Sequence, residues 1–232
     1  MTRTKFFSLL IIILFCFTNA VAQDYKAEKA EIERLLNQAV SDFNDAKYDK
    51  ALESSKQALI NSFAIKDDSY IAQSYNTIGA IYNECSDSKK AIGFYEKALS
   101  YAKKANKDKL YDWIYGNLGS VYYYNQIDVP KGINYYKKAL YYAEKIKDST
   151  DITNTKTNLA SAYFSIDKYD EGSQYLKGTK DYVLKNGDEE SKARINSLLG
   201  IYSTYHNSKA EAEQYYATAE KIAKKNKFDS YW

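Results

Sequence analysis

The chain has few of the residues that most catalytic and metal sites require. Its 232 residues include one histidine, two cysteines and one proline. A Cys–His pair would have to join Cys85 to His206, which lie far apart in the sequence, and no zinc-like spacing is present. The sequence also lacks a glycine-rich phosphate loop and a calcium loop. We therefore expect a protein that is not an enzyme, with no catalytic residue, no metal site and no cofactor.

The chain also lacks a strong charge of either sign. It has 33 Lys and Arg against 30 Asp and Glu, a formal net charge of +3. A nucleic-acid or anionic-membrane surface normally requires a clear excess of positive charge. We therefore expect no nucleic-acid partner.

Long apolar runs are scarce, and the one that exists lies at the N-terminus. It extends from Phe6 to Phe17, follows the basic residues Arg3 and Lys5, and precedes Ala20-Val21-Ala22. This order is typical of a secretory signal peptide, and the run is shorter than the roughly 20 residues of a membrane span. We expect residues 1–22 to be removed, which leaves no stable membrane span and places the protein in the periplasm or outside the cell. Cys85 then remains as a lone, partly buried cysteine.

Small residues recur at a fixed period through the rest of the chain. Glycine inside a helix costs about 1 kcal/mol relative to alanine, so its recurrence indicates a close approach of a second helix. A constant period of this length predicts one helical unit stacked on copies of itself. One series is Ala51, Ala91, Gly132, Gly172 and Ala212, with steps of 40, 41, 40 and 40; the other is Ala39, Gly79, Gly119, Ala160 and Gly200.

Short polar breaks divide each unit into two expected helices, and Pro130 falls at the start of one of them, where its missing N–H is harmless. We expect first helices near residues 25–45, 68–85, 109–125, 150–166 and 189–206. Second helices are expected near residues 48–65, 88–106, 130–147, 169–186 and 209–226.

The repeated motifs resemble tetratricopeptide repeats. The match is carried by Ile78-Gly79-x-x-Tyr82 with Ala91-x-x-x-Tyr95-x-x-Ala98, and by Leu118-Gly119-x-x-Tyr122 with Gly132-x-x-x-Tyr136-x-x-Ala139. The step of about 40 residues exceeds the usual 34, and the proline that normally ends a unit is missing. In its longer units without this proline, the chain is similar to the kinesin-light-chain-like subgroup. It is also similar to the exported sensor portions of bacterial tetratricopeptide regulators, including membrane histidine kinases.

The resemblance implies an all-α, right-handed superhelical solenoid of about five antiparallel helix pairs, whose first helices line a concave face. The solenoid is expected over residues 23–228, after the signal peptide of residues 1–22. Its units are expected near 28–67, 68–107, 108–148, 149–188 and 189–228. Residues 229–232, Asp-Ser-Tyr-Trp, parallel Asp68-Ser-Tyr-Ile71 and are interpreted as the start of an incomplete sixth repeat, so self-association through an uncovered C-terminal end is expected.

Most of the 25 tyrosines recur at core-facing positions, but several aromatic and amide residues lie one step beyond that face. Helical geometry directs such residues into the groove, where they suit peptides or glycans. The resemblance implies that asparagines two residues before the small residue can bind an extended peptide backbone; the alternative is that they are polar residues without a ligand. The basic clamp for an anionic C-terminus is missing, so no such ligand is expected. The hypothetical site comprises Asn37, Asn83, Trp113, Asn117, Tyr123, Tyr124, Asn158, Phe164 and Tyr205.

Three functions remain open from the sequence. The first is an exported scaffold that binds a protein or peptide on its concave face. The second is the extracytoplasmic sensor portion of a truncated signalling regulator such as a histidine kinase. The third, a glycan-binding accessory protein, depends only on the tyrosines and Trp113.

Overall fold

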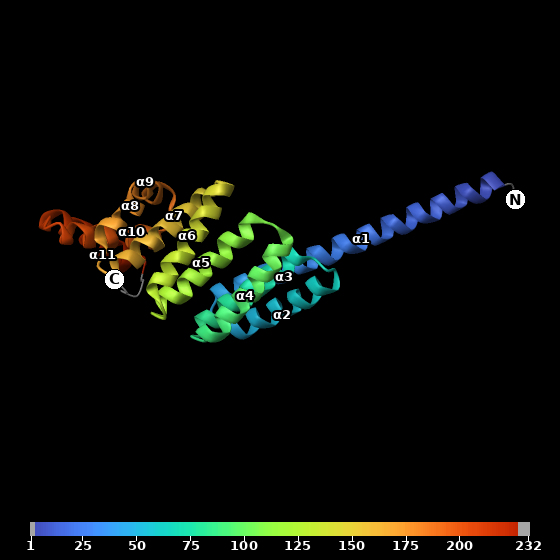
Figure 1. Cartoon of the computed structure of the whole chain (residues 1–232), viewed down its shortest axis with the longest axis horizontal. Helices are drawn as coiled ribbons and strands as arrows, with labels where there is room; N and C mark the ends of the chain where they lie inside the picture. The colour runs from blue at the N-terminus through green and yellow to red at the C-terminus, as the bar shows by residue number, and fades with distance from the viewer. Residues whose placement is uncertain (1–2, 227–232) are drawn as a thin grey trace. The chain divides into compact units, whose positions relative to one another are not determined.

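The computed structural model describes the backbone of residues 3–226 and the side chains of residues 23–226, and it divides into two compact units, residues 1–110 and 111–232. Every regular element in the described part of the chain is a helix (Figure 1). Unit 1 contains α1 (Arg3–Asn44), α2 (Tyr48–Ala64), α3 (Asp68–Glu84), α4 (Ser88–Ala105) and the first residues of α5 (Asp108–Tyr124). Unit 2 contains the rest of α5, then α6 (Val129–Ile146), α7 (Ser149–Phe164), α8 (Tyr169–Leu176), α9 (Thr179–Asn186), α10 (Glu189–Tyr205) and α11 (Lys209–Asn226).

Two of the expected helices differ from the structure. The expected helix over residues 169–186 is wrong, because it is broken into α8 and α9 at Lys177 and Gly178. Gly178 has a φ of +76°, a left-handed conformation that glycine adopts without steric cost and that ends a helix. The first helix begins at Arg3 instead of near residue 25, since the expectation treated residues 1–22 as already removed. Residues 229–232, interpreted as part of a sixth repeat, lie outside the described residues.

Aspartates cap the N-termini of five of the described helices, because their carboxylates accept hydrogen bonds from backbone N–H groups that have no partner inside the helix. Pro130 lies in the first turn of α6, as the sequence predicts. The capping aspartates are Asp67 for α3, Asp87 for α4, Asp128 for α6, Asp148 for α7 and Asp188 for α10.

Cys85, expected to be partly buried, is exposed, because it follows the last residue of α3.

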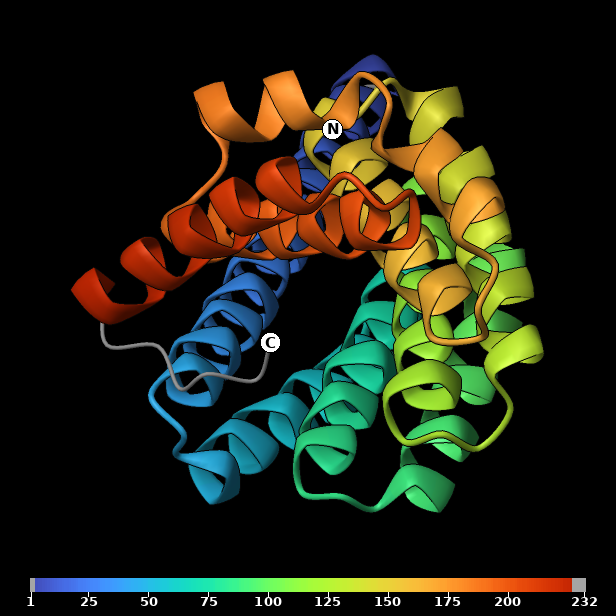
Figure 2. The ribbon, with the colours of Figure 1, turned by 90° about the vertical axis from the view of Figure 1, so that its left-hand side faces the viewer.

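Successive helices pack against each other within each unit. In unit 1, α2 lies between α1 and α3, and α3 also packs on α4. In unit 2, α7 packs on both α6 and α8, and α10 packs along α11 (Figure 2). No helix in the described part of the chain is both long and apolar enough to cross a membrane.

A glycine of the first helix meets a tyrosine ring of the second helix in three of the five pairs. A Cβ atom built on Gly119 would lie 2.5 Å from Cδ1 of Tyr136, and similar overlaps join Gly79 to Tyr95 and Gly200 to Tyr216. The remaining two pairs have alanine at the first position, and a smaller residue than tyrosine, Ser55 or Leu176, at the second. The two positions are therefore complementary in size, which explains the recurrent glycine that the sequence analysis noted.

Phe164, expected to project into a groove, belongs to the core of unit 2 and also lines a cavity there. Its side chain is only 6% exposed and packs with Leu176, Val183 and Ile195. Gly172 accommodates the ring, because a Cβ atom at that position would lie 2.5 Å from Cδ1 of Phe164. The register that carries Tyr123 in one pair thus carries a core residue in the next.

We predict that Gly119→Ala destabilises the protein although alanine favours helix. The added methyl group overlaps the Tyr136 ring, and overpacking of this kind costs about 1–3 kcal/mol, more than the gain of about 1 kcal/mol in helix propensity. Thermal unfolding followed by circular dichroism measures the effect. Gly116→Ala, in the same helix, is the control: nothing lies within 4 Å of its added Cβ, so it should stabilise. An unchanged Gly119→Ala midpoint would contradict the packing argument.

We predict that Phe164→Ala lowers the free energy of unfolding by about 3–5 kcal/mol, because it removes a buried aromatic ring and leaves a cavity. Tyr124→Ala should cost less than about 1 kcal/mol, since that side chain is 54% exposed. Denaturant titration of both variants tests the assignment. Equal losses would show that Phe164 is not a core residue.

Candidate functional site

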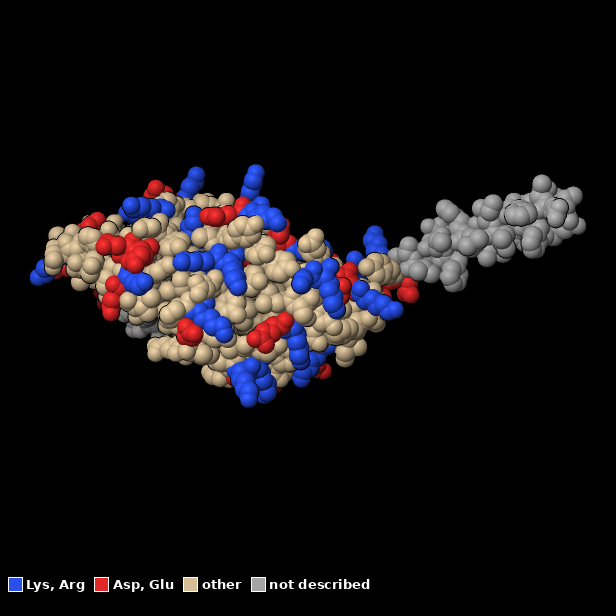
Figure 3. Space-filling model, viewed as in Figure 1, with Lys and Arg blue, Asp and Glu red and all other residues tan. Residues whose placement is uncertain are grey.

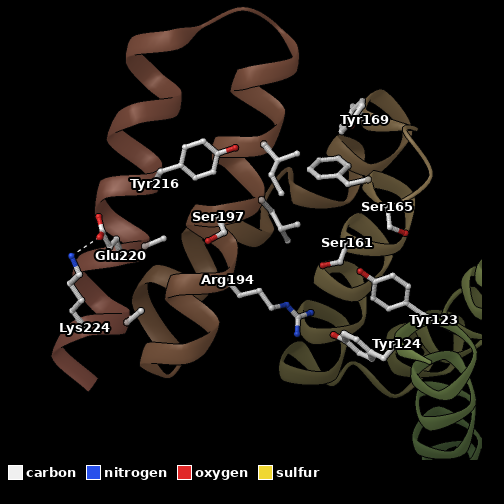
Figure 4. Close-up of a pocket in the computed structure, with 15 residues that line it drawn as sticks. Tyr123, Tyr124, Ser161, Ser165, Tyr169, Arg194, Ser197, Tyr216, Glu220 and Lys224 are labelled. Carbon is white, nitrogen blue, oxygen red and sulfur yellow. Dashed lines mark ion pairs between the residues drawn. The ribbon is translucent and has the colours of Figure 1, made fainter. Parts of the chain in front are cut away.

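Unit 2 contains a cavity of about 1030 Å³ between α5, α7, α8, α10 and α11. Figure 4 shows side chains from these helices directed toward the same space. Its lining combines an apolar wall, a series of hydroxyl groups and three charged residues. The apolar residues are Phe164, Leu198, Ile201, Ala219 and Ala223; the hydroxyl residues are Tyr123, Tyr124, Ser161, Ser165, Tyr169, Ser197 and Tyr216; the charged residues are Arg194, Glu220 and Lys224.

Repeated positions of the first helices supply most of this lining. Tyr123 and Tyr124 lie four and five residues after Gly119, and Phe164 and Ser165 lie at the same places after Ala160. The part of the cavity lining that α11 supplies is more exposed to solvent than the same register in earlier pairs. Its Tyr216 is 40% exposed, whereas Tyr95 and Tyr136 at the same register are 1% and 0% exposed.

Arg194 supplies the charge at the centre of the cavity. It extends from α10, and Figure 4 shows its guanidinium group directed toward Tyr123 and Tyr124. Its Nη2 donates a hydrogen bond to Oδ1 of Asn158 on α7. Its Nε is buried and has no hydrogen-bond partner among the described residues. Glu220 and Lys224 instead pair with each other across one turn of α11, with an N–O distance of 2.5 Å.

The Tyr123 hydroxyl of the cavity stays protonated at neutral pH. Burial raises the pKa of Tyr123 above its usual value, and neighbouring Tyr124 adds to the increase, whereas the positive charge of Arg194 opposes it. Burial likewise raises the pKa of Tyr136, whose hydroxyl lies 3.0 Å from that of Ser120. A protonated phenol can both donate and accept a hydrogen bond, so Tyr123 can serve either kind of ligand group.

The structure brings together only some of the nine predicted site residues. Tyr123, Tyr124 and Phe164 line the cavity, and Asn158 contacts it through Arg194. Tyr205 stacks on the cavity residue Tyr169 with ring centroids 4.4 Å apart. The remaining four residues do not line the cavity: Trp113 and Asn117 lie on α5, and Asn37 and Asn83 lie on α1 and α3 of unit 1.

The sequence analysis missed Arg194, the serines and the contribution of α11. A signal for Arg194 was available, because it lies six residues before Gly200, the same offset that separates Trp113 from Gly119. The hypothetical site predicted from the sequence includes Trp113 but not Arg194. No comparable signal indicated Tyr216, whose register predicted a buried ring like Tyr95.

Most of the other tyrosines form stacks that explain the excess of this residue by packing. In unit 2, Tyr115 stacks on Tyr111, Tyr135 and Tyr142 with centroids about 6 Å apart. Lys138 covers this stack with its ammonium group 5.3 Å from the Tyr115 centroid. Because the ring faces contact one another or lysine, they do not offer the free planar surfaces on which sugars pack.

Charged residues of both signs are interspersed on the face that Figure 3 displays. This pattern agrees with the small net charge of the sequence. Within the residues that the structure describes, no group of three His, Cys, Asp or Glu side chains could hold a metal ion.

No protein-family model and no curated protein matches this chain. Solved structures do match its fold. BtubC (BKLC) from P. vanneervenii has a TM-score of 0.75 at 17% identity, over 90% of this chain and 86% of its own. A putative kinesin light chain with nearly identical TPR-like repeats from Podosopora anserina has a TM-score of 0.63 at 14% identity, over 85% and 97% of the two chains.

A signal-transduction ATPase with a tetratricopeptide repeat sensor, from Pyrococcus horikoshii, has a TM-score of 0.71 at 16% identity. The match covers 94% of this chain and 33% of that larger chain. Likeness at such identities concerns the fold alone. The chain therefore has an all-α, tetratricopeptide-repeat-like fold, as its repeated motifs predict.

Proposed function

We propose that this chain is an exported, non-enzymatic repeat scaffold that binds an extended segment of a protein partner in the cavity of unit 2. The observation that carries the proposal is the cavity itself, about 1030 Å³ in volume, with a lining that combines apolar side chains and hydroxyl groups. Ligand sites commonly combine an apolar lining with a few polar groups that orient the ligand. Proteins with this fold generally mediate protein interactions, which supports a protein ligand over a small substrate.

The chemistry of the lining favours a peptide. Leu198 and Ile201 can pack against apolar side chains, while Ser161, Ser197 and the Tyr123 hydroxyl can bond a peptide backbone without selecting its side chains. A glycan is less well served, because the tyrosine faces of unit 2 largely contact one another.

A second candidate is the sensor portion of a larger signalling protein. It is favoured by the Pyrococcus protein, which is described as having a tetratricopeptide repeat sensor and of which 33% matches 94% of this chain. This role also requires ligand binding, so the cavity serves both proposals. The two differ in whether ligand binding is passed to an output domain.

We predict that peptides selected from a random displayed library bind the protein through Tyr124. Tyr124→Ala should weaken the selected peptides about tenfold or more, because aromatic residues dominate such interfaces. Fluorescence anisotropy with labelled peptides measures the affinities. Tyr141→Ala is the matched control: Tyr141 is also an exposed tyrosine of unit 2, 61% accessible, and does not line this cavity. Failure to select any peptide, or equal losses in the two variants, would refute the proposal.

We also predict that the protein produced in a Gram-negative bacterium is recovered from the periplasm with Gln23 as its first residue. The apolar run and the Ala20-Val21-Ala22 sequence provide the export signal and the cleavage site. Intact-mass measurement of the periplasmic fraction tests this. Ile12→Lys should interrupt the run and leave the uncleaved protein inside the cell. An uncleaved wild-type chain would contradict the prediction.

A further inference from the structure

We propose that the cavity of unit 2 recognises a carboxylate within its peptide ligand, and that Arg194 binds this group. The inference builds on the proposed peptide-binding function and specifies the chemistry of the ligand.

The first argument is the charge of the cavity. Three charged residues line it, and two of them, Glu220 and Lys224, form an ion pair with each other. None of the ion pairs among the described residues includes Arg194. No ion pair among the described residues therefore neutralises the positive charge that Arg194 brings to the cavity.

The second argument is that the hydrogen bonding of Arg194 is incomplete. A guanidinium group has five N–H donors. Here Nη2 bonds Asn158, an uncharged amide, and the buried Nε bonds no described residue. A partly buried donor without an acceptor is costly, so a ligand that supplies a charged acceptor gains from satisfying it. The planar guanidinium group is also the side chain best suited to binding a carboxylate through two nitrogens.

The third argument is that the acids near Arg194 are already engaged. Asp188, whose pKa is lowered mainly by hydrogen bonds with Ser191 and slightly by Arg194, caps the N-terminus of α10. Its carboxylate accepts from the backbone N–H of Ser191 at 2.7 Å. Asp188 is therefore not an acceptor for the buried Nε of Arg194, which leaves this donor open to a ligand.

The surroundings of Arg194 indicate what accompanies the carboxylate. On α10, Ser197 and Leu198 follow Arg194 by about one turn, and Ile201 follows by about two turns; all three line the cavity. If Arg194 bound an acidic residue of the ligand, the neighbouring residues of the ligand would lie beside the apolar side chains of Leu198 and Ile201. The preferred ligand is thus an acidic residue flanked by aliphatic residues.

The experiment uses the arginine side-chain signals of the ¹⁵N-labelled protein. The sequence has only three arginines, so the Nε–H region of the spectrum is simple, and Arg194→Gln assigns the Arg194 signal. Arg34 is an internal reference, because its Nε already donates to Glu31 at 2.8 Å. The probes are acetyl-Ala-Leu-Glu-Leu-Ala-amide, the same peptide with Gln in place of Glu, and the Gln peptide with a free C-terminal carboxylate.

We expect the Glu peptide to shift the Arg194 signal and to bind about tenfold or more tightly than the amidated Gln peptide, since hydrogen bonds to charged groups are the stronger kind. The Arg34 signal should stay in place. Arg194→Gln should bind the two amidated peptides equally, and Arg194→Lys should retain a weaker preference. If the Gln peptide with a free C-terminal carboxylate shifts the Arg194 signal, this result would also support carboxylate recognition. It would show that the carboxylate can be the one at the end of a peptide chain.

The inference would be overturned if neither peptide with a carboxylate bound more tightly than the amidated Gln peptide, if the preference survived in Arg194→Gln, or if no probe bound. The failure of the inference can be told from that of the proposed function. If library selection still yields peptides that depend on Tyr124 but carry no preferred acidic residue, peptide binding stands and the role of Arg194 falls. If selection yields no peptide, the proposed function itself is refuted.

Discussion

The close approach of the two helices in each pair is the constraint on which the structure depends. Gly119 has no side chain, so the ring of Tyr136 lies directly against its backbone. The tyrosine is fully buried as a result and joins the packing of the next pair, whose Leu159 belongs to the same cluster. One contact thus fixes the spacing within a pair and supplies apolar surface between neighbouring pairs, which is how a repeat protein builds its core.

The same contact accounts for the opening of the cavity at α11. Gly200 and Tyr216 repeat the glycine–tyrosine contact, but Tyr216 is 40% exposed, whereas Tyr136 is buried. The Tyr216 side chain therefore forms part of the cavity lining. A residue type that closes the core elsewhere here contributes to the candidate site.

Regularity and variation also explain where the candidate site lies. Some positions that pack between helices keep their residue type from pair to pair, as Ala98 and Ala139 do. Other positions vary: Arg194 lines the cavity, whereas Trp113 occupies the same register in another pair and does not. Such variation at a shared geometric position is how a repeated scaffold acquires a particular ligand without changing its fold.

The sequence alone determined most of the helices, their pairing and the close crossing, because these depend on local periodicity and on residue size at a fixed spacing. It also indicated Tyr123 and Tyr124 as cavity residues, since a helix directs residues at one offset to one side. Tertiary structure decided the rest. Phe164 shares the register of Tyr123 but is buried, because Gly172 opposite leaves room for its ring. Arg194 meets Asn158 only because α10 packs near α7. Contacts between residues distant in sequence depend on how helices pack, and no periodicity within one helix specifies them.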